Sequence, residues 1–148
     1  MDKFIDLTPE NIENEHLCCI IRSKKTHPGV EAKRAWLAER LTEGHIFRKL
    51  DEKATVFIEY APLEKAWVPI EGVNYIYIYC LWVLGDYREH GYGKKLMESC
   101  IADARALGSL YARLTQAKGV ALGSDICKAL RLRGGRHGRR IRAARPLV

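Results

Sequence analysis

Residues 74–93 read NYIYIYCLWVLGDYREHGYG, and this stretch decides the fold that the sequence predicts. Residues 74–84 are mostly aromatic and β-branched, which is typical of a central strand buried on both faces. A polar turn at 85–87 and the run Arg88-Glu89-His90-Gly91-Tyr92-Gly93 then lead into a helix predicted over 91–107. That helix ends at Gly108 and carries apolar residues at helical spacing. They are Leu96, Met97, Cys100, Ile101 and Ala104.

The segments before residue 74 predict two helices and three strands. Thr8 and Pro9 are typical of a helix start, with a hydroxyl cap and a proline at the first helical position. Pro28 and Gly29 mark a break, and Gly44 ends the amphipathic pattern that follows it. The polar turn 51–53 separates two β-branched and aromatic runs, which predict an antiparallel hairpin. We therefore expect a strand at 4–7, helices at about 9–21 and 30–42, and hairpin strands at 45–50 and 54–60.

Length and charge limit the classes of protein. The 148 residues fit one domain of ordinary size, and their net charge is +7. Residues 1–108 hold 15 Lys and Arg against 17 Asp and Glu, a net charge of −2, whereas residues 109–148 hold 10 against 1, a net charge of +9. Nucleic-acid binding needs basic groups on a folded face, so this distribution argues against it for residues 1–108.

Neither a membrane segment nor a metal site is expected. No run of 18 apolar residues occurs and the first residues lack a secretory pattern, so we expect a cytoplasmic protein without a membrane span. The cysteines form no C-x-x-C pair, which favours ordinary reduced thiols over metal ligands. They are Cys18, Cys19, Cys80, Cys100 and Cys127.

The turn after the central strand has the chemistry of an anion site. Two glycines, Gly91 and Gly93, let the backbone approach a diphosphate closely. The N–H groups in the first turn of a helix have no partner within the helix, so the segment 88–94 can point several donors at one anion. A structural turn is the alternative, because an Arg-x-x-Gly-x-Gly run alone is a weak signal.

This run resembles the (Gln/Arg)-x-x-Gly-x-(Gly/Ala) segment of the GNAT (GCN5-related) N-acetyltransferase superfamily. In that family the segment lies between the fourth strand and the next helix, after an apolar strand and an aromatic residue such as Tyr87. The resemblance implies an α+β fold with a central, mostly antiparallel sheet flanked by helices. It implies acetyl-CoA as cosubstrate, no metal, and direct attack of an amine on the thioester. The coenzyme-binding residues it implies are Leu81, Trp82, Val83, Arg88, Glu89, His90, Gly91, Tyr92, Gly93 and Lys94.

The resemblance does not identify the catalytic residues. An amine must lose a proton before it attacks, so a base or a water chain is needed near neutral pH. Glu59 is one candidate base, with a solvated or salt-bridged surface residue as the favoured alternative. Tyr75, Tyr77 and Tyr79 form a stripe at strand period, and Cys80 is expected on the opposite face as a packing residue. The acceptor is expected to be an amine-bearing small molecule or peptide, and a homodimer is left open.

The family pattern is not legible after about residue 108. Residues 1–108 are interpreted as an incomplete acetyltransferase core, with C-terminal strands missing or altered, and 109–148 as a poorly ordered basic tail. One hypothesis is that the tail is translated out of frame, with the shift near 108–110. Read one base later, possible codons for 130–139 permit Y-G-F-E-V-A-D-T-A, which resembles a segment near the end of GNAT domains; sequencing the coding DNA tests this.

Three functions are therefore compared. The first is an acetyl-CoA-dependent N-acetyltransferase, whose activity the altered tail puts in doubt. The second is nucleic-acid binding through the arginine-rich tail, which rests on composition alone. The third is a non-catalytic acyl-CoA-binding module.

Overall fold

The computed structural model describes residues 3–19, 27–52, 56–108, 111–114 and 142–143. Five strands form the main sheet in the order β1-β2-β3-β5-β6, and β4 pairs with β7 in a separate two-stranded sheet. The strands are β1 (Phe4–Asp6), β2 (Ile46–Leu50), β3 (Val56–Pro62), β4 (Ile70–Glu71), β5 (Tyr75–Val83), β6 (Tyr111–Leu114) and β7 (Arg142–Ala143). The helices are α1 (Pro28–Leu41) and α2 (Tyr92–Ala106), with 3-10 turns η1 (Ile12–Asn14), η2 (Leu63–Lys65) and η3 (Gly85–Tyr87).

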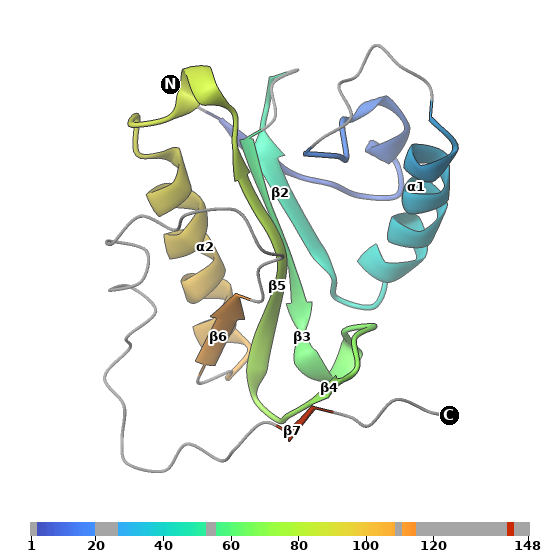
Figure 1. Ribbon diagram of the computed structural model, residues 1–148, viewed down its shortest axis with the longest axis vertical. Coiled ribbons are helices and arrows are strands. Elements are labelled where there is room, and N and C mark those ends of the chain that lie inside the picture. The colour runs from blue at the N-terminus through green and yellow to red at the C-terminus, as the bar shows by residue number, and fades with distance from the viewer. Residues whose placement is uncertain (1–2, 20–26, 53–55, 109–110, 115–141, 144–148) are drawn as a thin grey trace.

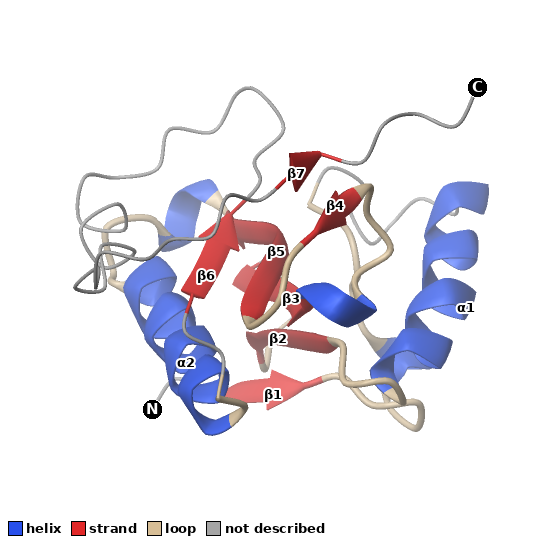
Figure 2. Ribbon diagram, turned by 90° about the horizontal axis from the view of Figure 1, so that it is seen from below, coloured by secondary structure: helices blue, strands red, loops and turns tan. Residues whose placement is uncertain are grey.

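The sheet separates the two long helices. Strands β1, β2, β3 and β5 are antiparallel neighbours, and β6 joins β5 in parallel. Helix α2 covers one face and α1 lies on the other, so the domain has three layers (Figures 1 and 2). The predicted mixed fold with a mostly antiparallel sheet is confirmed, as is the hairpin, and the strand predicted at 74–84 lies inside the sheet between β3 and β6.

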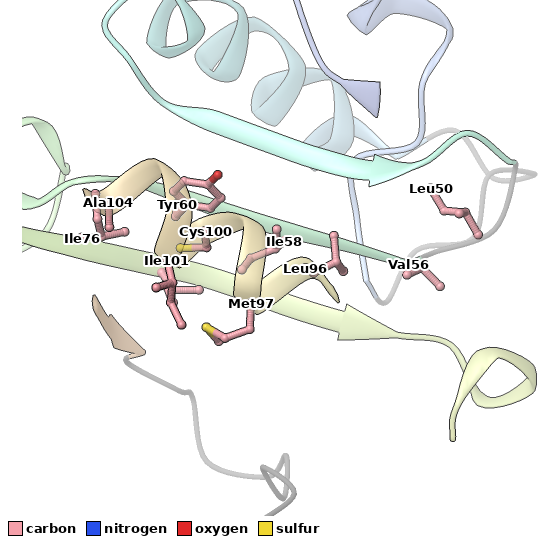
Figure 3. Packing of buried hydrophobic residues seen from close by; sticks show 11 residues of the cluster. Leu50, Val56, Ile58, Tyr60, Ile76, Leu96, Met97, Cys100, Ile101 and Ala104 are labelled. Atoms are coloured by element: carbon pink, nitrogen blue, oxygen red, sulfur yellow. The ribbon is translucent and has the colours of Figure 1, made fainter. Parts of the chain in front are cut away.

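Two hydrophobic cores lie on opposite faces of the sheet. The predicted apolar side of α2 is confirmed, because its five residues are all buried against β3 and β5 (Figure 3). On the other face, Leu37 of α1 packs with Phe47 and Phe57, whose rings stack 4.7 Å apart. Burial of such side chains is the main favourable term in folding.

A β-bulge changes the facing of the central strand. Glu59 of β3 pairs with Cys80, but Tyr60 pairs with Ile78, which leaves Tyr79 as an extra residue on β5. The side chains of Tyr79 and Cys80 therefore lie on the same face, toward α1. The expectation that Cys80 lies opposite the tyrosine stripe was wrong, because strict alternation ends at the bulge.

The prediction of a helix over 9–21 was wrong for residues 9–19, which are the part that the structure describes. Only η1 is helical there, and residues 15–19 have no regular structure. The side chain of Asn11 bridges Thr8 and Asp6, and Arg34 of α1 donates to the carbonyl of Ile12. These contacts thus occupy backbone groups that a helix would pair internally. The carboxylate of Glu15 forms an ion pair with Lys49.

The second helix begins earlier than predicted. Pro28 is its first residue rather than a break, and the side chain of His27 accepts the N–H of Gly29 as an N-cap. Proline suits this position because its missing N–H would be unpaired there.

Two further differences concern the central strand and the tail. Only Ile76 and Ile78 of β5 are fully buried, and both face α2, so the expectation that the strand is buried on both faces was wrong. No strand was expected after residue 108, yet Tyr111–Leu114 pairs with β5 as β6. The shifted reading over 130–139 lies outside the described residues.

Candidate coenzyme and acceptor sites

The loop between β5 and α2 has an unusual backbone. Glu89 has a φ of 66° and Gly91 a φ of 78°, both in the left-handed region. Glycine adopts this region freely, whereas a non-glycine residue there is strained. Such strained positions gather where a loop must hold a fixed shape around a ligand.

The amides of this loop are available to a ligand. Gly91 caps α2 without any side-chain hydrogen bond. Within the described part of the chain, the N–H groups of Glu89, His90, Gly91, Gly93 and Lys94 donate to no protein acceptor. The N–H of Arg88 was also expected to be a free donor, but it already donates to the carbonyl of Gly85 at 3.1 Å.

The side chains of the loop leave these amides uncovered. Arg88, Glu89 and His90 are exposed, and the His90 ring folds back so that Nδ1 lies 2.7 Å from the Arg88 carbonyl. This agrees with the expectation that His90 faces solvent. Lys94 is exposed, and its ammonium lies 3.9 Å from the carboxylate of Glu98, one turn further along α2.

One flank of β5 is open beside this loop. Strand β6 pairs only with residues 75–78, and among the described residues no strand pairs with the same flank of 79–83. The predicted coenzyme residues Leu81 and Val83 pack toward α2, whereas Trp82 packs toward α1. The indole Nε1 of Trp82 is buried without a hydrogen-bond partner in the described structure.

A buried polar cluster lies on the α1 face at the bulge. The carboxylate of Glu59 is 3.2 Å from Nε2 of His45 and 2.6 Å from Nζ of Lys33. Burial acts to raise the pKa of Glu59, but the hydrogen bond to His45 and the charge of Lys33 outweigh it, and the pKa is lowered. Glu59 is therefore ionised and salt-bridged, as the favoured alternative had it, although it is buried rather than solvated.

Aromatic rings connect this cluster to a surface cavity. The His45 ring lies 4.9 Å from Tyr79 and 5.3 Å from Trp36, centre to centre. The hydroxyl of Tyr79 accepts the backbone N–H of Trp67 at 3.0 Å, and Trp67 lines an open cavity of about 440 Å³. No sequence pattern singles out His45, because a histidine at the start of a predicted strand is not distinctive.

The described cysteines have the character of packing residues. Burial raises the pKa of the Cys80 thiol to about 12 and that of Cys100 to about 12, so both stay protonated near neutral pH. Among the described residues, no three His, Cys, Asp or Glu side chains are grouped as metal ligands. No helix in the described ranges has both the length and the hydrophobicity that crossing a bilayer requires.

Comparisons with known proteins identify the family. Residues 10–121 match the model of the acetyltransferase (GNAT) family. The chain is 48% identical over 105 residues to the "uncharacterized N-acetyltransferase YoaP" of Bacillus subtilis (strain 168), a match that covers 71% of this chain and 42% of that protein. The chain therefore belongs to the GNAT family, whose members are N-acetyltransferases that use acetyl-CoA, and it spans under half the length of this relative.

Solved structures agree on the fold. A GCN5-related N-acetyltransferase from Ralstonia eutropha JMP134 aligns with a TM-score of 0.58 at 19% identity, over 95% of this chain and 97% of that chain. An aminoglycoside acetyltransferase, meta-AAC0020, from an uncultured soil metagenomic sample in complex with sisomicin aligns with a TM-score of 0.59 at 16% identity, over 94% of this chain and 93% of that chain.

Proposed function

We propose that the protein transfers the acetyl group of acetyl-CoA to a primary amine by direct attack on the thioester. The observation that carries this proposal is the group of unpaired amides at 89–91, 93 and 94, which lies beside the open flank of β5. These donors and the start of α2 suit the coenzyme diphosphate. The pantetheine arm would then run along residues 79–83 toward the bulge.

The amine acceptor is proposed to approach from the α1 face. The bulge turns Tyr79 toward that face, beside the Glu59 cluster and the cavity at Trp67. The acceptor is an amine-bearing small molecule or a peptide. Attack, collapse of the tetrahedral intermediate and release of the CoA thiol then complete the transfer, and donors near the bulge would stabilise the oxyanion.

Calorimetry with acetyl-CoA and a panel of amines tests this function. The full chain should bind acetyl-CoA saturably and release CoA thiol faster with at least one of kanamycin, spermidine or a short peptide with a free N-terminus. Saturable binding without thiol release for any amine would favour a coenzyme-binding module. An absence of binding would contradict the proposal.

A further inference from the structure

His45 occupies a defined position between α1 and the central strands. It directly precedes β2, its backbone N–H donates to the carbonyl of Arg40 at 3.2 Å, and the residue is 5% exposed. Trp36 and Tyr79 pack against the ring, which limits its rotation. The imidazole is therefore held with Nε2 toward Glu59.

Glu59 fixes which ring nitrogen carries the proton. Because this carboxylate is ionised, both of its oxygens act only as acceptors, one for Lys33 and the other for His45. A neutral imidazole that faces it must carry its proton on Nε2. Nδ1 then has the free lone pair, which is the arrangement that a histidine base requires.

We propose that His45 is the base that removes a proton from the acceptor ammonium, and that Glu59 is a positioning residue that sets the tautomer of His45. This inference rests on the proposed function, because it needs the thioester near the bulge of β5. The pairing of Glu59 with Cys80 puts the cluster beside that bulge. The ring is only 5% exposed, so the proposal includes a water molecule that carries the proton from the acceptor to Nδ1.

Every proton and electron pair in the proposed acetyl transfer has a donor and an acceptor. The ammonium gives one proton to Nδ1 of His45 and becomes an amine, whose lone pair forms the bond to the thioester carbon. The carbon–sulfur bond then breaks, and the second proton from the nitrogen goes to the departing thiolate. His45 releases its proton to solvent, so an ammonium and a thioester give an amide, a thiol and one proton.

Charges from two elements, β3 and α1, act on the imidazolium that forms. Glu59 of β3 stabilises it, whereas Lys33 and Arg40 of α1 oppose it. The nearest ionisable groups of β5 are Tyr79 and Cys80, and burial raises the pKa of both, so neither is charged near neutral pH.

Two substitutions test the roles separately. His45→Gln keeps an amide that can reach Glu59 but removes the base, so kcat should fall roughly a hundredfold or more with little change in KM. In the wild type, kcat/KM should rise with pH as the imidazole loses its proton, and this limb should be absent in His45→Gln. Glu59→Gln should keep the limb, because the base remains in place, but lower kcat, because the carboxylate no longer orients the imidazole.

Lys49→Met is the matched control. Lys49 is also buried on the α1 face and pairs with Glu15 at 2.5 Å, so its loss should lower stability to a similar degree. The pH profile should stay that of the wild type. An unchanged kcat and pH limb in folded His45→Gln protein would overturn the proposal.

A measurement without an acceptor separates this inference from the proposed function. In 15N-histidine-labelled protein, His45 should be the Nε2–H tautomer above its titration, and Glu59→Gln should change its tautomer balance. An Nδ1–H tautomer of His45 would contradict the inference even if the protein binds acetyl-CoA. If His45→Gln binds acetyl-CoA normally, its coenzyme site is intact. A loss of turnover in that variant then comes from removal of the base.

Discussion

Single residues set the shape of the coenzyme loop. Glu89 and Gly91 both have positive φ, and together they turn the chain from η3 into α2. An ideal Cβ on Gly91 would meet no atom within 4 Å, so the glycine is required by its backbone angle rather than by crowding. The glycine at position 91 therefore helps to set the direction in which the N–H groups of the loop point.

Gly91→Ala should weaken acetyl-CoA binding. An alanine in the left-handed region costs about 1 to 2 kcal/mol, and relief of that strain would turn the amides away from the diphosphate. Calorimetry should give a Kd for acetyl-CoA raised roughly tenfold. Gly85→Ala is the control, because Gly85 has no positive φ and equal space for a Cβ; equal losses in both variants would contradict the role assigned to Gly91.

The ionised Glu59 should make stability depend on pH. Its folded-state pKa lies below the ordinary value of 4.5, so its pairing stabilises the fold fully above that pH. The contribution is lost as the pH falls from 4.5 through the lowered folded-state pKa. Chemical denaturation of wild type and Glu59→Gln should therefore differ most at neutral pH and converge on acidification. A difference that is constant with pH would contradict this.

At the scale of elements, Arg48 joins the sheet edge to α2. Its guanidinium in β2 bonds Asp6 of β1 at 2.6 and 2.9 Å and Asp103 of α2 at 3.0 Å. Tyr60 of β3 adds a contact at 3.4 Å and donates to Asp103. The Arg48 side chain is only 18% exposed, so water cannot replace these bonds fully.

Arg48→Met should destabilise the fold by about 1 to 3 kcal/mol, because charge-assisted bonds are lost and Asp103 stays partly buried. Urea denaturation measures this. Lys3→Met is the control for a charge change at the same edge, since Lys3 and Asp51 form an exposed pair that contributes about 0 to 1 kcal/mol. Equal effects would contradict a special role for Arg48.

At the scale of the whole molecule, ligand binding and folding are linked. The proposed coenzyme site uses α2 and β5, and both belong to the larger hydrophobic core. Acetyl-CoA at 100 times its Kd should stabilise the protein by about 2.7 kcal/mol and raise Tm by roughly 5 to 10 °C. Differential scanning fluorimetry measures this shift, with adenosine as a control that lacks the diphosphate. A Tm that acetyl-CoA leaves unchanged would contradict a site in this core.

The parts of the fold that were predicted are those with a strong local pattern. Helix α2 and strands β2, β3 and β5 have regular apolar spacing, and the loop before α2 has its glycines in sequence. The helix expected near residue 9 failed because Arg34, distant in sequence, takes the carbonyl of Ile12. The face of the strand predicted for Cys80 was wrong because a bulge has no sequence signature in an apolar strand.

The amino-acid sequence by itself determined the family resemblance, the glycine-containing loop before α2 and the core side of α2, because short-range spacing encodes each of them. Only the tertiary structure decided that, among the described residues, no strand pairs with one flank of β5 at 79–83, and that His45, Glu59 and Lys33 meet in one cluster. Those three residues come from α1, β3 and the turn before β2, and contacts between such segments depend on strand register and helix docking, which no local pattern specifies.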